Sequence, residues 1–211
     1  MRLLLLLSIF SLSIAYAQKD DFTWTLRKDD KGVKVATNFI YGSEFFSMKA
    51  TCAVNRKLED VLLFFVKVED YPKWQSDMLY AKLVDTSKQL LRDKASLEYN
   101  EIYLPWPYKN RDIVAEKTLK QTNDVCWEVA YLSKPDAYPI SEDNVRVKST
   151  KGVWTFCDDN GSTTIEHTNT TKNETGIPNW IVEMFIVDGP FKTLVNLKES
   201  LEVGLDKRQQ N

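Results

Sequence analysis

The chain has 211 residues, a formal net charge of −2 and 43% hydrophobic residues, a composition suited to one folded domain. Acidic and basic residues are interspersed, so no basic surface that would follow a nucleic-acid backbone is expected. The only three cysteines, at positions 52, 126 and 157, exclude a disulfide-rich scaffold.

The first residues have the pattern of a secretory signal peptide. Arg2 supplies one positive charge, an apolar run covers 3–14, and an A-x-A cleavage pattern ends at Ala17. An apolar run of about twelve residues is shorter than the about 20 that span a bilayer. We therefore expect a signal peptide over 1–17 and a domain over 18–211 that is exported to the periplasm or the extracellular space.

Runs of aromatic and β-branched residues between polar breaks dominate the rest of the chain and indicate strands. Nine such runs are expected to form strands: 22–27, 33–41, 45–54, 79–86, 95–104, 111–122, 125–133, 145–156 and 163–171. Apolar residues at helical spacing predict a helix over 58–68, with Asn55 as its N-cap and a turn over 70–74 behind it.

A second, longer helix is expected from Pro178 to about Lys207, with a break at Gly189-Pro190. Its first two turns are apolar on nearly every side, so the helix must be covered on both sides. A position across the concave face of a curved sheet would meet that requirement. The helix is then either a plain core element or the lid of a cavity.

The segment 95–115 combines two strands with a proline-locked aromatic corner. Pro105 and Pro107 fix φ and remove backbone donors, so the chain leaves its ladder before them and cannot resume pairing until after Tyr108. The pattern Y-x-E-x-x-x-P-W-P-x-x-N-R-D-x-V, which begins at Tyr99, resembles the START lipid-transfer family, and most closely its phosphatidylcholine-transfer branch. The pattern G-x-W at 152–154, the pattern G-I-P-x-W at 176–180 and Trp74 resemble the same family.

The resemblance implies an α+β helix-grip fold, in which a curved antiparallel sheet of seven to nine strands wraps round a long C-terminal helix and encloses a tunnel. It implies binding and carriage of one lipid or sterol-like ligand, without a cofactor, by a monomer that contacts membranes transiently. The phosphatidylcholine-transfer branch holds the lipid phosphate with an Arg three residues before its Trp. Here Tyr71 stands at that position.

One candidate site lies on the strand 111–122. Lys117 shares the strand face of Ile113 and Ala115, so it is the charged member of an apolar face. Pairing residues whose numbers sum to about 215 sets Glu98 opposite Lys117, whereas a slip of one residue would set Leu97 there. The pair is either buried, as a similarly placed acid and base are in sterol-binding START domains, or solvated at the surface.

Further candidate ligand contacts come from two apolar stretches. Trp127 and Tyr131 share one face of the strand 125–133, where they would line either the core or the tunnel. Trp180, Met184 and Phe185 lie at the start of the closing helix. The adjacent Arg111 and Asp112 face opposite sides of their strand, and we expect them to be structural.

The sequence favours a binding protein over an enzyme, and no catalytic or metal-binding residue is expected. The only histidine, His167, is expected near the surface, and no nucleotide-binding or nucleophile motif is present. Two alternatives remain: a cavity enzyme of the polyketide cyclase or dehydratase type, and a ligand sensor that acts through a partner protein.

The cysteines leave a further choice open. Cys126 and Cys157 could meet across strands if a bulge near Gly152 adjusts the pairing, or they could stay free as small buried hydrophobes.

Overall fold

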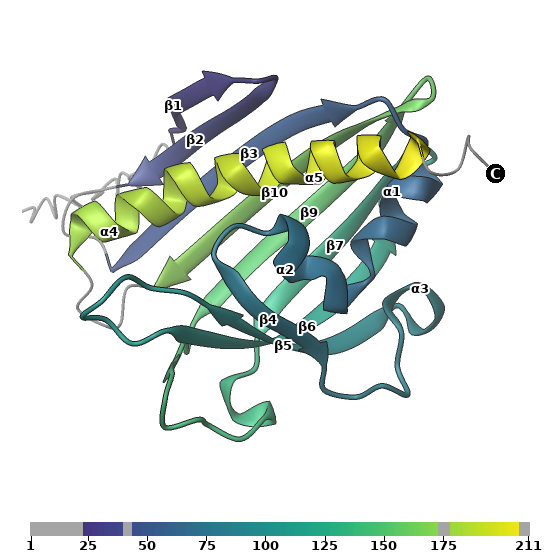
Figure 1. Ribbon diagram of the computed structural model, residues 1–211. Helices are drawn as coiled ribbons and strands as arrows, with labels where there is room; N and C mark the ends of the chain where they lie inside the picture. Colours follow the sequence, from purple (N-terminus) through teal and green to yellow (C-terminus); the bar gives the residue numbers. More distant parts are fainter. Residues whose placement is uncertain (1–22, 40–43, 173–177, 207–211) are drawn as a thin grey trace, which may run out of the picture.

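A computed structural model describes residues 23–39, 44–172 and 178–206. The ten strands of this part of the chain form one open, curved sheet that wraps round the C-terminal helical segment (Figure 1). The strands are β1 (Thr25–Asp30), β2 (Val33–Phe39), β3 (Phe45–Val54), β4 (Met78–Leu83), β5 (Ala95–Ile102), β6 (Arg111–Gln121), β7 (Cys126–Ser133), β8 (Val145–Arg146), β9 (Thr150–Asp159) and β10 (Ser162–Lys172).

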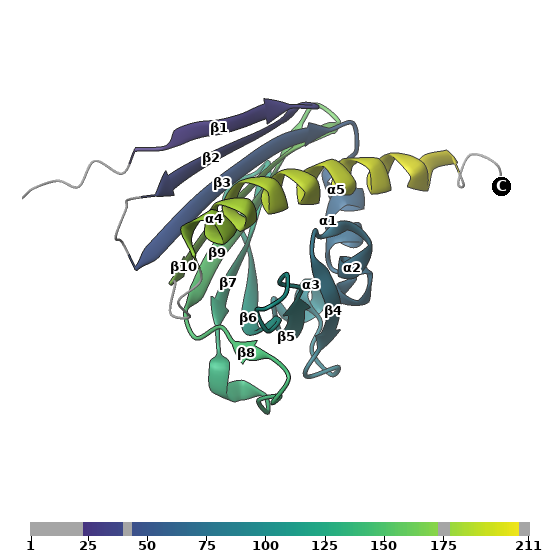
Figure 2. The same ribbon diagram turned by 60° about the vertical axis from the view of Figure 1, so that its left-hand side comes forward.

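The strand order is β1-β2-β3-β10-β9-β7-β6-β5-β4, and every neighbouring pair along it is antiparallel. The two-residue β8 lies off this path and pairs in parallel with the start of β6. Turning the view shows the β1 edge on one side of the closing helix and the β4 edge on the other (Figure 2). The expected helix-grip architecture is therefore confirmed.

The helices are short except the last. They are α1 (Leu58–Phe65), α2 (Tyr71–Trp74), α3 (Leu90–Asp93), α4 (Asn179–Glu183) and α5 (Gly189–Asp206), with 3-10 turns at Val68–Asp70 and Pro135–Ala137. A π-helical turn, Met184–Asp188, joins α4 to α5. Together these three segments form the closing helix across the concave face of the sheet (Figure 1).

Several predicted boundaries were wrong. The single strand expected over 145–156 is split into β8 and β9, which gives ten strands in the described chain. The first strand begins at Thr25 rather than at 22, which lies outside the described residues. Lys57, not Asn55, precedes α1 as its N-cap, and it makes no side-chain capping bond. The four-residue α3 was missed because it spans about one helical turn, which is too short for an apolar period to repeat in the sequence.

The closing helix differs from expectation at two points. Pro178 is its N-cap, with φ −58° and ψ 145°, rather than its first helical residue. No break occurs at Gly189-Pro190, because the helix continues through both residues. The irregularity lies one turn earlier, where the Gly189 N–H donates to the Met184 carbonyl in a π-type bond. The wider turn accommodates a proline that has no N–H for the ordinary helical bond.

Part of the concave face is filled by an aromatic cluster from α1, α2 and β9. The Phe65 ring lies 4.9 Å from that of Phe156 and 5.2 Å from that of Trp154, and the Tyr71 ring lies 5.4 Å from that of Trp74. All five side chains are buried. Burial of such a side chain stabilises a fold by roughly 1.5–3 kcal/mol, so this cluster is a substantial part of the core.

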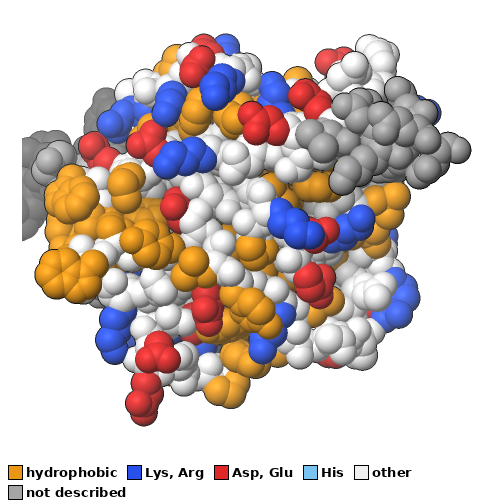
Figure 3. All heavy atoms as spheres, viewed as in Figure 1, with side chains coloured by type: hydrophobic (Ala, Val, Ile, Leu, Met, Phe, Trp, Pro, Cys, Tyr) orange, Lys and Arg blue, Asp and Glu red, His pale blue; other side chains and the backbone are white. Residues whose placement is uncertain are grey.

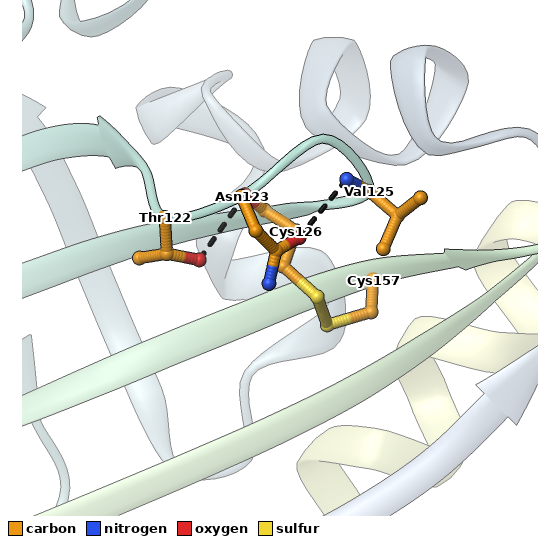
Figure 4. Close-up of a disulfide and its surroundings, with 5 residues drawn as sticks. All are labelled: Thr122, Asn123, Val125, Cys126 and Cys157. Carbon is orange, nitrogen blue, oxygen red and sulfur yellow. Dashed lines mark hydrogen bonds between the residues drawn. A yellow bond between two sulfur atoms is a disulfide. The ribbon is translucent and has the colours of Figure 1, made fainter.

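A disulfide links Cys126 and Cys157 at the end of the β6–β7 hairpin (Figure 4). The two residues are direct partners in the β7–β9 ladder, whose register runs without interruption from Cys126–Cys157 to Leu132–Lys151. No bulge near Gly152 is needed. The hairpin itself is held by Val125 N–H, which donates to Asn123 Oδ1 at 3.0 Å, and by Thr122 Oγ1, which donates to the Cys126 carbonyl at 3.3 Å.

Candidate functional site

A cavity of about 280 Å³ lies between the concave face of the sheet and the closing helix. Its walls come from β3, β5, β6, β7, β9, β10 and the segment from α2 to β4. Val182, Phe185, Ile186, Gly189 and Pro190 of the closing helix cover it. Most of the lining is apolar, and several of its polar residues form three groups.

Strand β6 runs along one wall of the cavity. Its alternate residues Arg111, Ile113, Ala115 and Lys117 all line the space, as the two-residue period of a strand requires. Two apolar side chains therefore separate two cationic ones. The prediction that Lys117 lies on an inward apolar face is confirmed.

The first polar group is an ion pair between Lys117 and Glu98. Lys117 Nζ lies 2.7 Å from Glu98 Oε2, and the two side chains are 7% and 1% exposed. Lys117 Nζ also donates to the Tyr71 hydroxyl at 2.9 Å, and it lies 4.5 Å from the centre of the Tyr71 ring. Ser96 Oγ donates to Glu98 Oε1 at 3.2 Å. Burial, and then the charge of Glu98, raise the pKa of Tyr71 well above its usual value.

The predicted register was wrong although the predicted pair forms. Glu98 lies opposite Ala115, and Ser96 lies opposite Lys117, so paired numbers sum to 213 rather than 215. An error of two residues leaves each side chain on the same face. The long Lys117 side chain then reaches Glu98 along the diagonal between neighbouring strands.

The second polar group lies on β7 and β10 and centres on Tyr131. Its hydroxyl accepts a hydrogen bond from Asn169 Nδ2 at 2.7 Å and lies 2.9 Å from His167 Nε2. The Tyr131 side chain reaches β10 by crossing Gly152, where an added Cβ would come within 2.3 Å of the Tyr131 hydroxyl oxygen. The glycine is therefore required by this close approach.

His167 lines the cavity, so the expectation that it lies near the surface was wrong. Its ring stacks on that of Trp154, with 3.8 Å between the ring centres and 8° between the planes. Burial, and then the charge of Lys117, lower the pKa of His167 to about 3. The imidazole is therefore neutral in the folded protein at physiological pH. Burial also raises the pKa of Tyr131 above its usual value.

The third polar group is Arg111 with Asn100, at the end of β6 nearer the proline-locked corner. Both side chains are buried and both line the cavity. Asp112 faces the other side of the sheet, where Arg146 Nε and Nη2 donate to its two oxygens at 2.9 and 3.0 Å. The expectation of a structural role thus holds for Asp112, whereas Arg111 belongs to the cavity.

The structure brings three of the seven predicted ligand contacts to the cavity wall: Lys117, Tyr131 and Phe185. Glu98 lies behind Lys117. Trp127 packs against the core on the same face of β7, with Lys94 Nζ 5.0 Å from its ring centre. Trp180 and Met184 are 63% and 37% exposed and are not part of the cavity wall.

Sequence reasoning missed Asn100, Arg111, Trp154, His167 and Asn169. Strand parity alone could have grouped Arg111 with Lys117. To predict that residues of β9 and β10 line the cavity, one must know which strands are neighbours in the sheet, and the sequence does not supply that order.

In the described part of the chain, no group of three or more His, Cys, Asp and Glu side chains could hold a metal ion. No helix among the same residues has the length and apolar character needed to cross a bilayer.

Comparison with known proteins agrees with this architecture. No family model matches the chain. An uncharacterized protein of Pseudomonas aeruginosa is 28% identical over 181 residues, which cover 85% of this chain and 87% of that protein. The crystal structure of a STAR-related lipid transfer protein from Xanthomonas axonopodis superposes with a TM-score of 0.76 at 26% identity, covering 85% of this chain and 98% of that one.

The chain thus has the fold of START lipid-transfer domains, and it is similar in sequence to the bacterial STAR-related lipid transfer protein. Human STARD10 has the same fold, with a TM-score of 0.70 at 19% identity over 89% of this chain and 76% of that one. Human StAR-related lipid transfer protein 5 also has it, with a TM-score of 0.70 at 14% identity over 87% of this chain and 88% of that one. At these identities the human structures establish the fold of this chain and nothing finer.

Proposed function

We propose that this protein binds one hydrophobic ligand, a lipid or a sterol-like molecule, in the cavity under the closing helix and carries it without altering it. The observation that carries the proposal is the mostly apolar cavity of about 280 Å³ under the closing helix, with polar groups at separate points of its wall. Pockets for small molecules start at roughly 300 Å³, so a lipid-sized ligand requires the closing helix or the rim to move outward.

The Glu98–Lys117 pair is proposed to meet an uncharged oxygen of the ligand. Lys117 Nζ has three protons, and two of them are directed to Glu98 and Tyr71, so one donor remains for a ligand hydroxyl or carbonyl. A phosphate at this point would face the Glu98 carboxylate. Because Tyr71 replaces the arginine of the phosphatidylcholine-transfer branch, this end favours a neutral group.

A carrier is favoured over a cavity enzyme by the state of the titratable groups. A general base works best when its pKa lies near the operating pH. The pKa of His167 is lowered to about 3, and the pKa of Tyr131 is raised above its usual value. Neither group is poised to exchange a proton at neutral pH.

Exposed aromatic side chains support transient contact with a membrane. Trp106 at the proline-locked corner is 91% exposed and Trp180 in α4 is 63% exposed. Hydrophobic side chains gather at the α4 end of the molecule in Figure 3. Tryptophan is enriched at membrane–water interfaces. Leu104, beside the corner, and Val182 of α4 both line the cavity, so a membrane held there would adjoin it.

Export to the periplasm or the extracellular space is part of the proposal. The Cys126–Cys157 disulfide supports it, because disulfides persist in oxidising compartments. The proposed signal peptide over 1–17 lies outside the described residues. The proposed carrier acts as a monomer.

The test is transfer of labelled lipids and sterols between donor and acceptor vesicles. The proposal expects transfer that rises with protein concentration, followed by recovery of the ligand with its mass unchanged. A changed ligand mass would favour the cyclase or dehydratase alternative. Stoichiometric binding without transfer would favour a sensor that acts through a partner protein.

A further inference from the structure

We propose that Arg111 and Asn100 form an anion-binding subsite, so that the ligand is an amphiphile whose carboxylate or phosphate group lies at this end of the cavity. The inference rests on the proposed function, since it names the head group of the ligand that the cavity holds.

Arg111 is a buried cation that lacks an anionic partner. Its side chain is 7% exposed, and its Nη1 donates to the Lys109 carbonyl. Its Nε finds no acceptor, and no carboxylate among the described residues lies within 4.0 Å of its guanidinium. Burial lowers the pKa of Arg111, and no neighbouring charge raises it. A buried charge without a partner is strongly unfavourable, which a bound anion would relieve.

The neighbouring aspartate does not supply that partner. Asp112 lies on the opposite face of β6, and Arg146 from β8 already occupies both of its oxygens. The Arg146–Asp112 pair therefore lies outside the cavity, and the guanidinium of Arg111 lies inside it.

Asn100 adds a neutral hydrogen-bonding group beside Arg111. On β5, Ile102 lies opposite Arg111 and Asn100 lies opposite Ile113, so Asn100 and Arg111 are diagonal neighbours that line the same cavity. The Asn100 side chain is 8% exposed and its Oδ1 has no hydrogen-bond donor. Its amide nitrogen can donate to an anion that the guanidinium holds. Paired donors of this kind bind carboxylate and phosphate oxygens.

The charges along the wall favour an anion. The lining contains four cationic side chains, Arg111, Lys117, Lys148 and Lys172, against one acidic side chain, Asp77. Glu98 neutralises Lys117, and Glu44 Oε2 lies 3.3 Å from Lys172 Nζ. Within the described residues, Arg111 and Lys148 have no such counter-charge.

The wall between the two ends suits an apolar chain. Arg111 and Lys117 are six positions apart on β6, which corresponds to roughly 20 Å of extended strand. Ile113 and Ala115 lie between them on the cavity face, with Val182 and Ile186 above. An anionic head at Arg111 would let an acyl or ring system extend toward the Glu98–Lys117 pair.

The experiment compares the fluorescent fatty acid cis-parinaric acid with its uncharged methyl ester. We expect the wild-type protein to bind the acid at least about tenfold more tightly than the ester, as a charge-assisted pair predicts. Arg111→Gln should abolish that ratio by weakening the acid alone. Lys120→Gln removes the same charge from an exposed position on the same strand and should keep the ratio.

A second variant keeps the test decisive if Arg111→Gln does not fold. Asn100→Asp places a carboxylate beside Arg111, so it should lower affinity for the acid about tenfold and leave the ester unaffected. Displacement of the probe by dioleoyl phosphatidic acid but not by dioleoylglycerol would assign the anion to a phosphate. Displacement by palmitate but not by dioleoyl phosphatidic acid would assign it to a carboxylate.

Equal binding of acid and ester by the wild-type protein would overturn the anion subsite while leaving the carrier proposal intact. An unchanged acid-to-ester ratio in both Arg111→Gln and Asn100→Asp would do the same. If neither probe binds and the protein also transfers no lipid or sterol between vesicles, the proposed function itself fails.

Discussion

Lys117 Nζ lies 2.7 Å from Glu98 Oε2 although the two residues are not opposite each other in the sheet, where Glu98 pairs with Ala115. The contact is diagonal and buried, and the Tyr71 hydroxyl from α2 accepts a further hydrogen bond from Lys117. These contacts connect β5 and β6 to α2, which contributes Tyr71 and Trp74 to the aromatic cluster.

Removal of one member of the buried pair should be costly. Lys117→Met leaves the Glu98 carboxylate buried without its cation, and we expect the free energy of unfolding to fall by about 3–5 kcal/mol, with weaker ligand binding. Urea unfolding and ligand titration measure the two effects. The double change Glu98→Leu with Lys117→Met should recover most of the stability without recovering the hydrogen bond to the uncharged oxygen of the ligand, so ligand binding should stay weak.

A matched control is Lys134→Met, because Lys134 pairs with Glu116 at 3.3 Å where both side chains are more than 40% exposed. That change should alter stability by no more than about 1 kcal/mol. Unchanged stability and affinity in Lys117→Met would contradict the proposed polar site.

Gly152→Ala should destabilise the sheet and displace Tyr131. The added Cβ would come within 2.3 Å of both the Tyr131 hydroxyl oxygen and the Thr168 carbonyl oxygen, and the second belongs to the backbone of β10. We expect a loss of about 1–3 kcal/mol in urea unfolding. Gly189→Ala is the control, because no atom lies within 4 Å of its added Cβ, and it should be neutral or slightly stabilising. Equal stabilities of the two variants would show that Tyr131 does not cross Gly152.

The pH dependence of stability should reflect His167, the only histidine of the chain. Its pKa is lowered to about 3 in the folded protein, against about 6.5 in an unfolded chain. The unfolded chain therefore binds a proton below pH 6.5 that the folded protein does not accept until about pH 3. The free energy of unfolding should fall as the pH drops from 7 to 5, by up to about 2 kcal/mol.

His167→Gln should remove most of this slope between pH 7 and pH 5. The imidazole resonances in an NMR titration of the folded wild-type protein should stay constant down to about pH 4. A titration midpoint near 6.5 would instead place the ring in solvent.

Thiol counting tests the disulfide. Denatured protein without reductant should show one reactive thiol, that of Cys52, and reduced protein should show three, since the chain has three cysteines. In the native protein Cys52 should react slowly, because burial raises the pKa of its thiol to about 11. Replacing Cys126 and Cys157 by Ser should cost about 2–4 kcal/mol of stability. Three thiols without reductant would exclude the bridge.

Most strands and the closing helix could be predicted from the sequence because they have strong local patterns, whereas the helix-grip architecture was implied by the resemblance to the START family. β3 runs from Phe45 to Val54 as expected, and parity alone placed Lys117 on the inner face. Parity is insensitive to an error of two residues, which is why the Glu98–Lys117 pair survived a wrong register. His167 shows the opposite case. Its burial depends on Trp154 and Tyr131 from β9 and β7, and strand order across a sheet is a long-range property without a local signal.

The central claim is that the cavity holds one hydrophobic ligand, and native mass spectrometry tests it most directly. The purified protein is incubated with vesicles made from a total lipid extract of its native host, re-isolated by size exclusion and weighed intact. The account predicts a species heavier than the bare chain by the mass of one lipid, and extraction into organic solvent should release that lipid unchanged. A spectrum that contains only the bare chain after this exposure would contradict the account.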